Sequence, residues 1–250
     1  MNRVKADKIY LINLERRQDR LTHFLEECKR ESINLYNLEI FKAYDSKSYK
    51  IKDEDIRLFK NADFGMNCDY SKPCMCNQLS HFSILKDIVK KKYKKCIIFQ
   101  DDVRFRNNFV EDVNNVLDNM PKDREIIWIG LHKEYAGSYF KDFDLEEDNK
   151  DKYYVKERVN DYICKYKDDI NPCSLAYIVT YEGAKRYIDY IEKKGFLYAT
   201  DVNFNGYLIS KDIMYGSYDV LCTGNHKFKS DIFESDNYAI ERDMMELLGI

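Results

Sequence analysis

A short apolar run at Cys96–Phe99 continues through Gln100 into two adjacent carboxylates, Asp101 and Asp102. Such a run is typical of a buried strand. Two like charges a few ångströms apart raise each other's pKa unless a cation lies near them. Ligands of open α/β sheets bind at the carboxyl ends of strands, where this pair is expected. Carboxylate oxygens, together with those of a diphosphate, suit Mg²⁺ or Mn²⁺, so the pair is a candidate metal site. The alternative interpretation is that Asp101 and Asp102 form an ordinary acidic turn.

Two further groups of polar residues are candidates for binding. Asn13 lies near the end of the first apolar run of the chain, and Arg17 and Arg20 follow that run. They could meet the base, ribose or diphosphate of a nucleotide, or they could start a helix and line its solvated face. His81 follows Ser80 beside an apolar stripe with helical spacing. A lone histidine in such a place is more often a hydrogen-bonded structural residue than a ligand.

The elements that must position these residues follow from the spacing of apolar side chains. Short apolar runs predict strands over 8–14, 38–44, 96–99, 126–130, 174–180 and 214–221. Helical spacing predicts helices over 21–28, 53–60, 79–89, 110–117, 182–193 and 201–209, and a last helix near Met244. Alternating strands and helices predict an α/β fold with a mostly parallel central sheet and helices on both faces.

Length and charge limit the classes of protein to consider. The 250 residues suit a single domain spanning 1–250. The net charge is −3 with the signs interspersed, so we expect no nucleic-acid partner. No signal-like segment begins the chain, and no apolar run approaches the roughly 18 residues of a membrane span. We therefore expect a soluble, cytoplasmic protein. Residues 133–169 are acidic and Tyr-rich with a weak pattern, and we expect an acceptor-side insertion, either a hairpin or a lid.

Together, several segments resemble glycosyltransferase family 25, which includes lipopolysaccharide glycosyltransferases and collagen hydroxylysine galactosyltransferases. The resemblance covers nearly the whole chain in order. It implies a GT-A-type fold, a UDP-sugar donor (most often UDP-galactose) and inversion at the anomeric carbon. The matching segments are Ile9–Arg20, Leu79-Ser80-His81, Ile97–Val103, Ala176–Thr180 with Gly183-Ala184, the acidic Asp201, and Ser230-Asp231-Ile232.

The resemblance also implies roles for particular residues. Asp101 and Asp102 would hold Mn²⁺ or Mg²⁺ against the donor diphosphate, with Asp101 also close to the donor. Asp201 would be the catalytic base for the acceptor hydroxyl. His226 would be a late metal or phosphate ligand, or else a surface-loop histidine. The residues expected beside the nucleotide are Asn13, Arg17, Arg20, Ser80 and His81. The acceptor would be a glycan, a polysaccharide or a collagen-like chain.

The sequence departs from the family pattern at two points. Gln100 stands where the family usually has Glu, which removes one charge but keeps a hydrogen-bonding oxygen. Residues two apart share a strand face, so Gln100 and Asp102 occupy the places of a spaced acidic pair. The small-residue turn before Leu79 is also altered. Two alternatives therefore stay open: a catalytically impaired binding or scaffold protein, and a metal-dependent phosphohydrolase.

Overall fold

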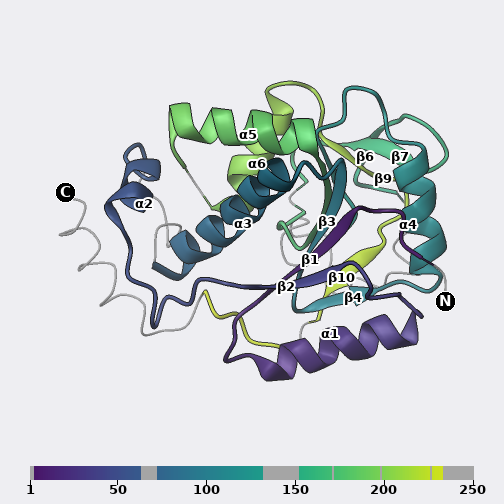
Figure 1. Ribbon diagram of the computed structural model, residues 1–250. Coiled ribbons are helices and arrows are strands. Elements are labelled where there is room, and N and C mark those ends of the chain that lie inside the picture. The colour runs from purple at the N-terminus through teal and green to yellow at the C-terminus, as the bar shows by residue number, and fades with distance from the viewer. Residues whose placement is uncertain are drawn as a thin grey trace.

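The computed structural model describes residues 3–62, 72–131, 152–170, 172–197, 199–225 and 227–232. An eight-stranded sheet carries helices on both faces, and a two-stranded sheet lies beside it (Figure 1). The strands are β1 (Lys8–Asn13), β2 (Leu38–Lys42), β3 (Lys95–Gln100), β4 (Val103–Phe105), β5 (Ile126–Trp128), β6 (Val155–Arg158), β7 (Ile163–Tyr166), β8 (Ala176–Thr180), β9 (Tyr215–Ser217) and β10 (Cys222–Gly224). The helices are α1 (Gln18–Arg30), α2 (Asp53–Leu58), α3 (Lys72–Lys91), α4 (Phe109–Asp118), α5 (Tyr181–Lys194) and α6 (Thr200–Ile209).

The strands of the large sheet follow the order β2-β1-β3-β8-β5-β9-β7-β6. Six of these eight strands run in one direction, and β8 and β7 run in the other. The predicted α/β fold with a mostly parallel sheet is therefore confirmed. The reversed β8 between β3 and β5 was not foreseen, because a buried strand is apolar on both faces whichever way it runs.

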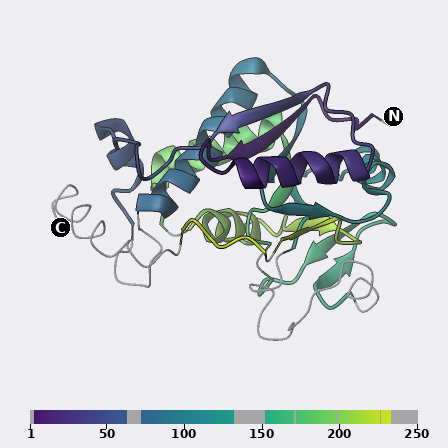
Figure 2. The same cartoon turned by 90° about the horizontal axis from the view of Figure 1, so that it is seen from below.

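Different helices cover the two faces of the sheet (Figures 1 and 2). On one face Phe99 of β3 packs against Phe24 of α1 and Phe109 of α4, with ring centroids 5.9 and 6.0 Å apart. On the other face Tyr177 of β8 packs against His81 of α3 and Phe204 of α6, at 5.8 and 5.4 Å. These aromatic layers hold the strand ends, and hence the polar residues that follow them, in fixed positions.

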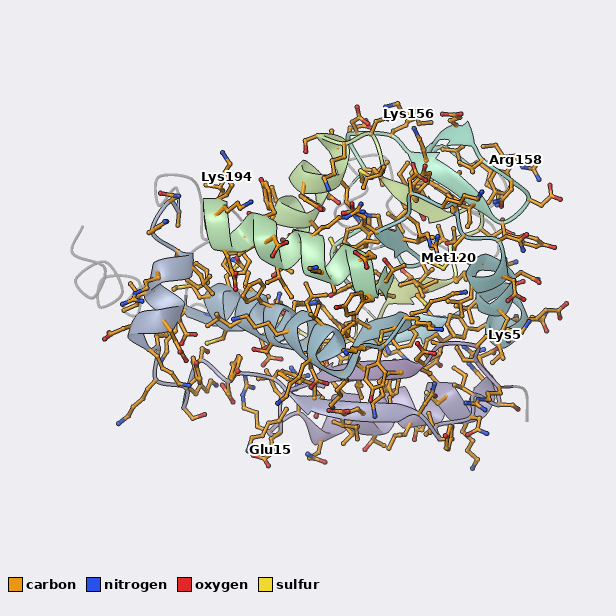
Figure 3. All side chains as sticks on the ribbon, turned by 45° about the horizontal axis from the view of Figure 1, so that its top comes forward. Lys5, Glu15, Met120, Lys156, Arg158 and Lys194 are labelled. Atoms are coloured by element: carbon orange, nitrogen blue, oxygen red, sulfur yellow. The ribbon has the colours of Figure 1, made fainter. Side chains whose placement is uncertain are left out.

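Strand β6 forms one edge of the sheet, and most of its side chains are exposed. Lys156 and Arg158 of this strand point outward in Figure 3. Charged side chains on an edge strand disfavour pairing with another chain. β6 and β7 form an antiparallel hairpin, so the described part of the segment 133–169 has regular structure. Its place on the acceptor side stays a prediction.

Each strand and helix expected before residue 210 is present, with bounds shifted by a few residues or, for the helix ahead of β3, by about two turns. The strand expected over 214–221 is only β9, because the chain bends after Ser217. The three-residue strands β4 and β10 are too short to show a pattern in sequence. The helix predicted near Met244 lies outside the described residues. Across the described ranges, no helix is both long and apolar enough to cross a membrane.

Candidate active site

A cavity of about 580 Å³ opens where β1 and β3 end. Ligand pockets of this kind are typically about 300–1,000 Å³. Seven parts of the chain line the cavity: the end of β1 with the segment after it, the loop after β2, the start of α3, the end of β3, the turn before β8, the start of α6, and Asn225 with residues 228–232. The predicted metal pair and the predicted catalytic base, Asp201, line the same cavity.

The register of β1 against β3 explains the surroundings of Asp101. Ile12 lies opposite Gln100, so the next residues along the two strands, Asn13 and Asp101, are neighbours. The Asn13 amide donates to Asp101 Oδ2 at 2.7 Å, and Arg20 Nη1 lies 3.0 Å from Asp101 Oδ1. Burial raises the pKa of Asp101 to about 6, although the nearby Arg20 charge acts in the opposite direction.

Asp102 also pairs with Arg20: the same Nη1 atom that contacts Asp101 lies 3.5 Å from Asp102 Oδ2. The other oxygen, Asp102 Oδ1, is buried and has no hydrogen-bond partner among the described residues. A buried carboxylate oxygen without a partner is costly, and a divalent cation would satisfy it. The described ranges hold no cluster of three His, Cys, Asp or Glu side chains for a metal. The pair therefore fits a cation that takes its remaining ligands from a diphosphate or water.

Three arginines of the β1–α1 segment converge on Asp231 at the rim of the cavity. Arg16 Nη1 lies 2.7 Å from Asp231 Oδ1, and Arg20 Nη2 lies 3.5 Å from Oδ2. Arg17 Nη1 forms an ion pair with the same Oδ2. The guanidinium carbons of Arg17 and Arg20 also lie 5.8 and 5.5 Å from the ring centre of Phe228. Guanidinium groups favour carboxylate and phosphate oxygens as partners, so the three arginines are suited to an anion.

His81 lies behind the cavity wall and does not line the cavity. Its Nδ1 is 2.8 Å from the Tyr177 hydroxyl, and its Nε2 is 3.5 Å from Gln100 Nε2. Burial lowers the pKa of His81 to about 3, so the ring is neutral at neutral pH. With the proton on Nδ1, Nε2 can accept from the Gln100 amide, which a Glu at this position could not supply when ionised. The amide at position 100 therefore matches a neutral histidine.

The turn before β8 brings Cys173 and Ser174 to the cavity with φ of 63° and 48°. Non-glycine residues in this left-handed region carry strain and cluster at functional sites. Gln100 Nε2 lies 3.4 Å from Ser174 Oγ. Ser80 also lines the cavity, but its hydroxyl already donates to the Cys76 carbonyl at 2.7 Å and accepts from the Tyr44 N–H at 3.0 Å. Ser80 thus fixes the loop after β2.

The structure brings most of the predicted site residues together. Asn13 and Arg17 contact lining residues without lining the cavity themselves, and His226 lies outside the described residues. Sequence reasoning assigned no role to Arg16 or to Asp231. The available signals were the position of Arg16 next to Arg17 and the position of Asp231 within the matching segment Ser230-Asp231-Ile232. The predicted residues that line the cavity are Arg20, Ser80, Asp101, Asp102 and Asp201.

Comparison with known proteins identifies the family. The sequence model of glycosyltransferase family 25 (LPS biosynthesis protein) matches residues 6–204. The chain therefore belongs to glycosyltransferase family 25, and its α/β architecture is the fold class expected from the resemblance.

Individual relatives differ in what their names state. Procollagen galactosyltransferase 2 of Homo sapiens is 26% identical over 193 residues, which are 73% of this chain and 27% of the relative. Inactive glycosyltransferase 25 family member 3 of Homo sapiens is 23% identical over 137 residues, 52% of this chain and 22% of the relative. The chain thus spans about a quarter of the length of these relatives. The crystal structure of galactosyltransferase LgtC with donor and acceptor sugar analogues has 10% identity and a TM-score of 0.42, with 97% of this chain and 95% of that chain covered.

Proposed function

We propose that this protein transfers a hexose, with galactose as the first candidate, from a UDP-sugar to a hydroxyl group of an acceptor. The observation that carries the proposal is the joint placement of Asp101, Asp102 and three arginines at one cavity. Divalent cations and guanidinium donors are both favourable partners for the oxygens of a nucleoside diphosphate. Membership of family 25 supports the same class of reaction.

In this proposal the two carboxylates would hold Mn²⁺ or Mg²⁺, which supplies Lewis-acid charge for the departing UDP. Arg20 bridges both carboxylates and so keeps them at a fixed separation. Arg16 and Arg17 would donate to the diphosphate and neutralise part of its charge. Asn13 would hold Asp101 in place through its amide hydrogen bond. These residues bind and orient the donor before any bond changes.

Inversion requires a base on the acceptor side of the sugar. Asp201, in the first turn of α6, lines the cavity together with Gln100 and Ser174. It would take the proton of the acceptor hydroxyl as that oxygen attacks the anomeric carbon and UDP departs. Gln100 and Ser174 would contact the sugar hydroxyls and so influence the choice of hexose. His81 would support Gln100 from behind, rather than touch the nucleotide.

The acceptor is proposed as a glycan, a polysaccharide or a collagen-like chain. The name of procollagen galactosyltransferase 2 supports the last of these. Residues 133–169, which include the β6–β7 hairpin, are the proposed acceptor-side region.

A catalytically impaired binding or scaffold protein is the second candidate, and Gln100 in place of the usual family Glu favours it. One relative of 23% identity is named an inactive glycosyltransferase 25 family member, which supports loss of catalysis as an alternative.

Turnover separates the two candidates. UDP release should be measured with UDP-galactose, UDP-glucose and UDP-N-acetylglucosamine, with Mn²⁺, with Mg²⁺ and with a chelator, over a panel of acceptor glycans and collagen-like peptides. We expect cation-dependent release of UDP from one donor in preference to the others. Binding of UDP with no release from any donor and acceptor would support the impaired protein. Absence of both UDP binding and release would contradict the proposal that the cavity is a donor site.

A further inference from the structure

Residues 227–232 run along the rim of the cavity and beside the start of α1. This segment, the yellow trace after β10 in Figure 1, is called the strap here. β10 pairs with β4, opposing Gly224 to Val103, and the Asn225 N–H donates to the Asp102 carbonyl at 2.7 Å. The strap therefore leaves the two-stranded sheet directly beside the acidic pair.

The strap reaches the β1–α1 segment through charged and aromatic contacts. The Lys229 carbonyl accepts from Arg20 Nη2 at 2.6 Å, and the Phe228 ring lies beneath two guanidinium groups. The Asp231 side chain is only 10% exposed and pairs with Arg16, Arg17 and Arg20. A single carboxylate thus pairs with three guanidinium groups that line or flank the cavity.

A carboxylate and a phosphate group offer guanidinium donors similar oxygen acceptors. Arg20 links the two regions, because Nη1 contacts the acidic pair and Nη2 contacts the strap. A diphosphate that reached the acidic pair would need the N–H groups that Asp231 now accepts from. Both anions cannot accept from the same N–H groups at once.

We propose that the strap is a self-inhibitory latch: Asp231 occupies the anion position of the donor diphosphate, and the diphosphate must displace it to bind. The proposal rests on the proposed donor site, since it concerns the regulation of that site. The competing interpretation is that Asp231 only orients the arginines. When the Asp231 charge is removed, the latch predicts a higher affinity for a diphosphate, whereas an orienting role predicts a lower affinity.

The test is the affinity of the full chain for inorganic pyrophosphate, measured by titration calorimetry in a chelator so that the arginines alone are probed. Asp231→Asn should bind pyrophosphate about tenfold more tightly than the wild type, because the intramolecular competitor has lost its charge. Equal or weaker binding by this variant would overturn the latch. Weaker binding is the result expected if Asp231 only orients the arginines, because its removal would leave them out of position.

Asp19→Asn is the matched control. Asp19 pairs with Arg17 through both oxygens, at 2.8 and 2.9 Å, but it is 53% exposed and does not line the cavity. Like Asp231→Asn, this control removes one negative charge and one ion-pair partner of Arg17. Its affinity for pyrophosphate should change by less than about twofold. A gain equal to that of Asp231→Asn would assign the effect to overall charge and overturn the latch.

Hydrogen exchange of the wild-type strap gives a second measurement that needs no variant. Amides in the peptide covering 227–232 should exchange faster when pyrophosphate is saturating, because the strap is released. Slower exchange would mean that the strap closes over the anion, which contradicts displacement. The proposed transferase activity can fail separately: absence of turnover with tighter pyrophosphate binding by Asp231→Asn would leave the latch standing. Turnover with no such gain would remove the latch alone.

Discussion

Asn13 and Asp101 lie 88 positions apart in the chain, yet the Asn13 amide donates to the Asp101 carboxylate at 2.7 Å. The parallel pairing of β1 with β3 creates this contact, since it ends both strands at the same level. The hydrogen bond stabilises the ionised form of a carboxylate whose burial favours the protonated form. Asn13 is therefore the link between the first strand and the acidic pair.

Asn13→Ala should lower the free energy of unfolding by about 1–3 kcal/mol, because a buried carboxylate loses a hydrogen-bond donor. Urea unfolding monitored by the fluorescence of Trp128 measures the change. Asn114→Ala is the control, since Asn114 forms exposed hydrogen bonds with Arg3 and Lys5, and should cost less than about 1 kcal/mol. Equal losses in the two variants would contradict the special role of Asn13.

Asp102→Asn should abolish the Mn²⁺-dependent part of UDP stabilisation and lower turnover by at least about 100-fold. The buried Asp102 Oδ1 is the oxygen that a cation would satisfy, and an amide is a much weaker cation ligand. Thermal unfolding with UDP, with and without Mn²⁺, measures the first effect. Asp118→Asn, at an exposed ion pair with Lys5, should behave as wild type. Full turnover by a folded Asp102→Asn protein would exclude the metal role.

Gln100→Glu should raise the pKa of His81, because it places a carboxylate beside the buried ring. The variant should also be less stable above pH 7, by about 1 kcal/mol, since a partly buried charge replaces an amide. Titration of the histidine ring by NMR measures the pKa, and urea unfolding measures the stability. Gln100→Leu is the uncharged control and should leave the ring neutral. An unchanged His81 pKa in the Glu variant would contradict the Gln100–His81 contact.

Acid should destabilise the protein partly through His81. Its folded pKa, about 3, lies below the usual 6.5, so the unfolded chain binds more protons in this window. The contribution of His81 to stability is present above pH 6.5 and is lost as the pH falls toward 3, by a few kcal/mol in order of magnitude. The free energy of unfolding of His81→Asn should depend less steeply on pH over this range than that of the wild type. Parallel curves would contradict the assignment.

The features that could be predicted from the sequence are those formed by neighbours along the chain. The apolar run before Asp101 and Asp102 predicts both the strand and the position of the pair at its end. The spacing around His81 predicts a helix. It does not predict how deeply the His81 side chain is buried, because that burial depends on packing against Tyr177 of β8. The residue pattern favoured a hydrogen-bonded structural histidine, whereas the family resemblance implied a place beside the nucleotide. His81 is found behind Gln100, hydrogen-bonded to Tyr177.

Contacts between distant segments could not be predicted in the same way. Arg17 and Asp231 are separated by 214 positions, and only the pairing of β4 with β10 directs the strap toward α1. Strands of three residues leave almost no periodic signal. The family resemblance marked residues 230–232 as a motif, but no local pattern indicated their arginine partners.

The insertion of β8 between β3 and β5 also has a consequence for protein synthesis. Strands β1, β2, β3 and β5 are all complete by Trp128, yet in the sheet β3 and β5 are joined through β8, which comes later in the chain. A chain leaving the ribosome must expose the free edge of β3 until residue 176 has emerged, and such an edge favours aggregation. The lining of the cavity extends from Ile12 to Ile232, so the cavity is complete only after residue 232 has been synthesised.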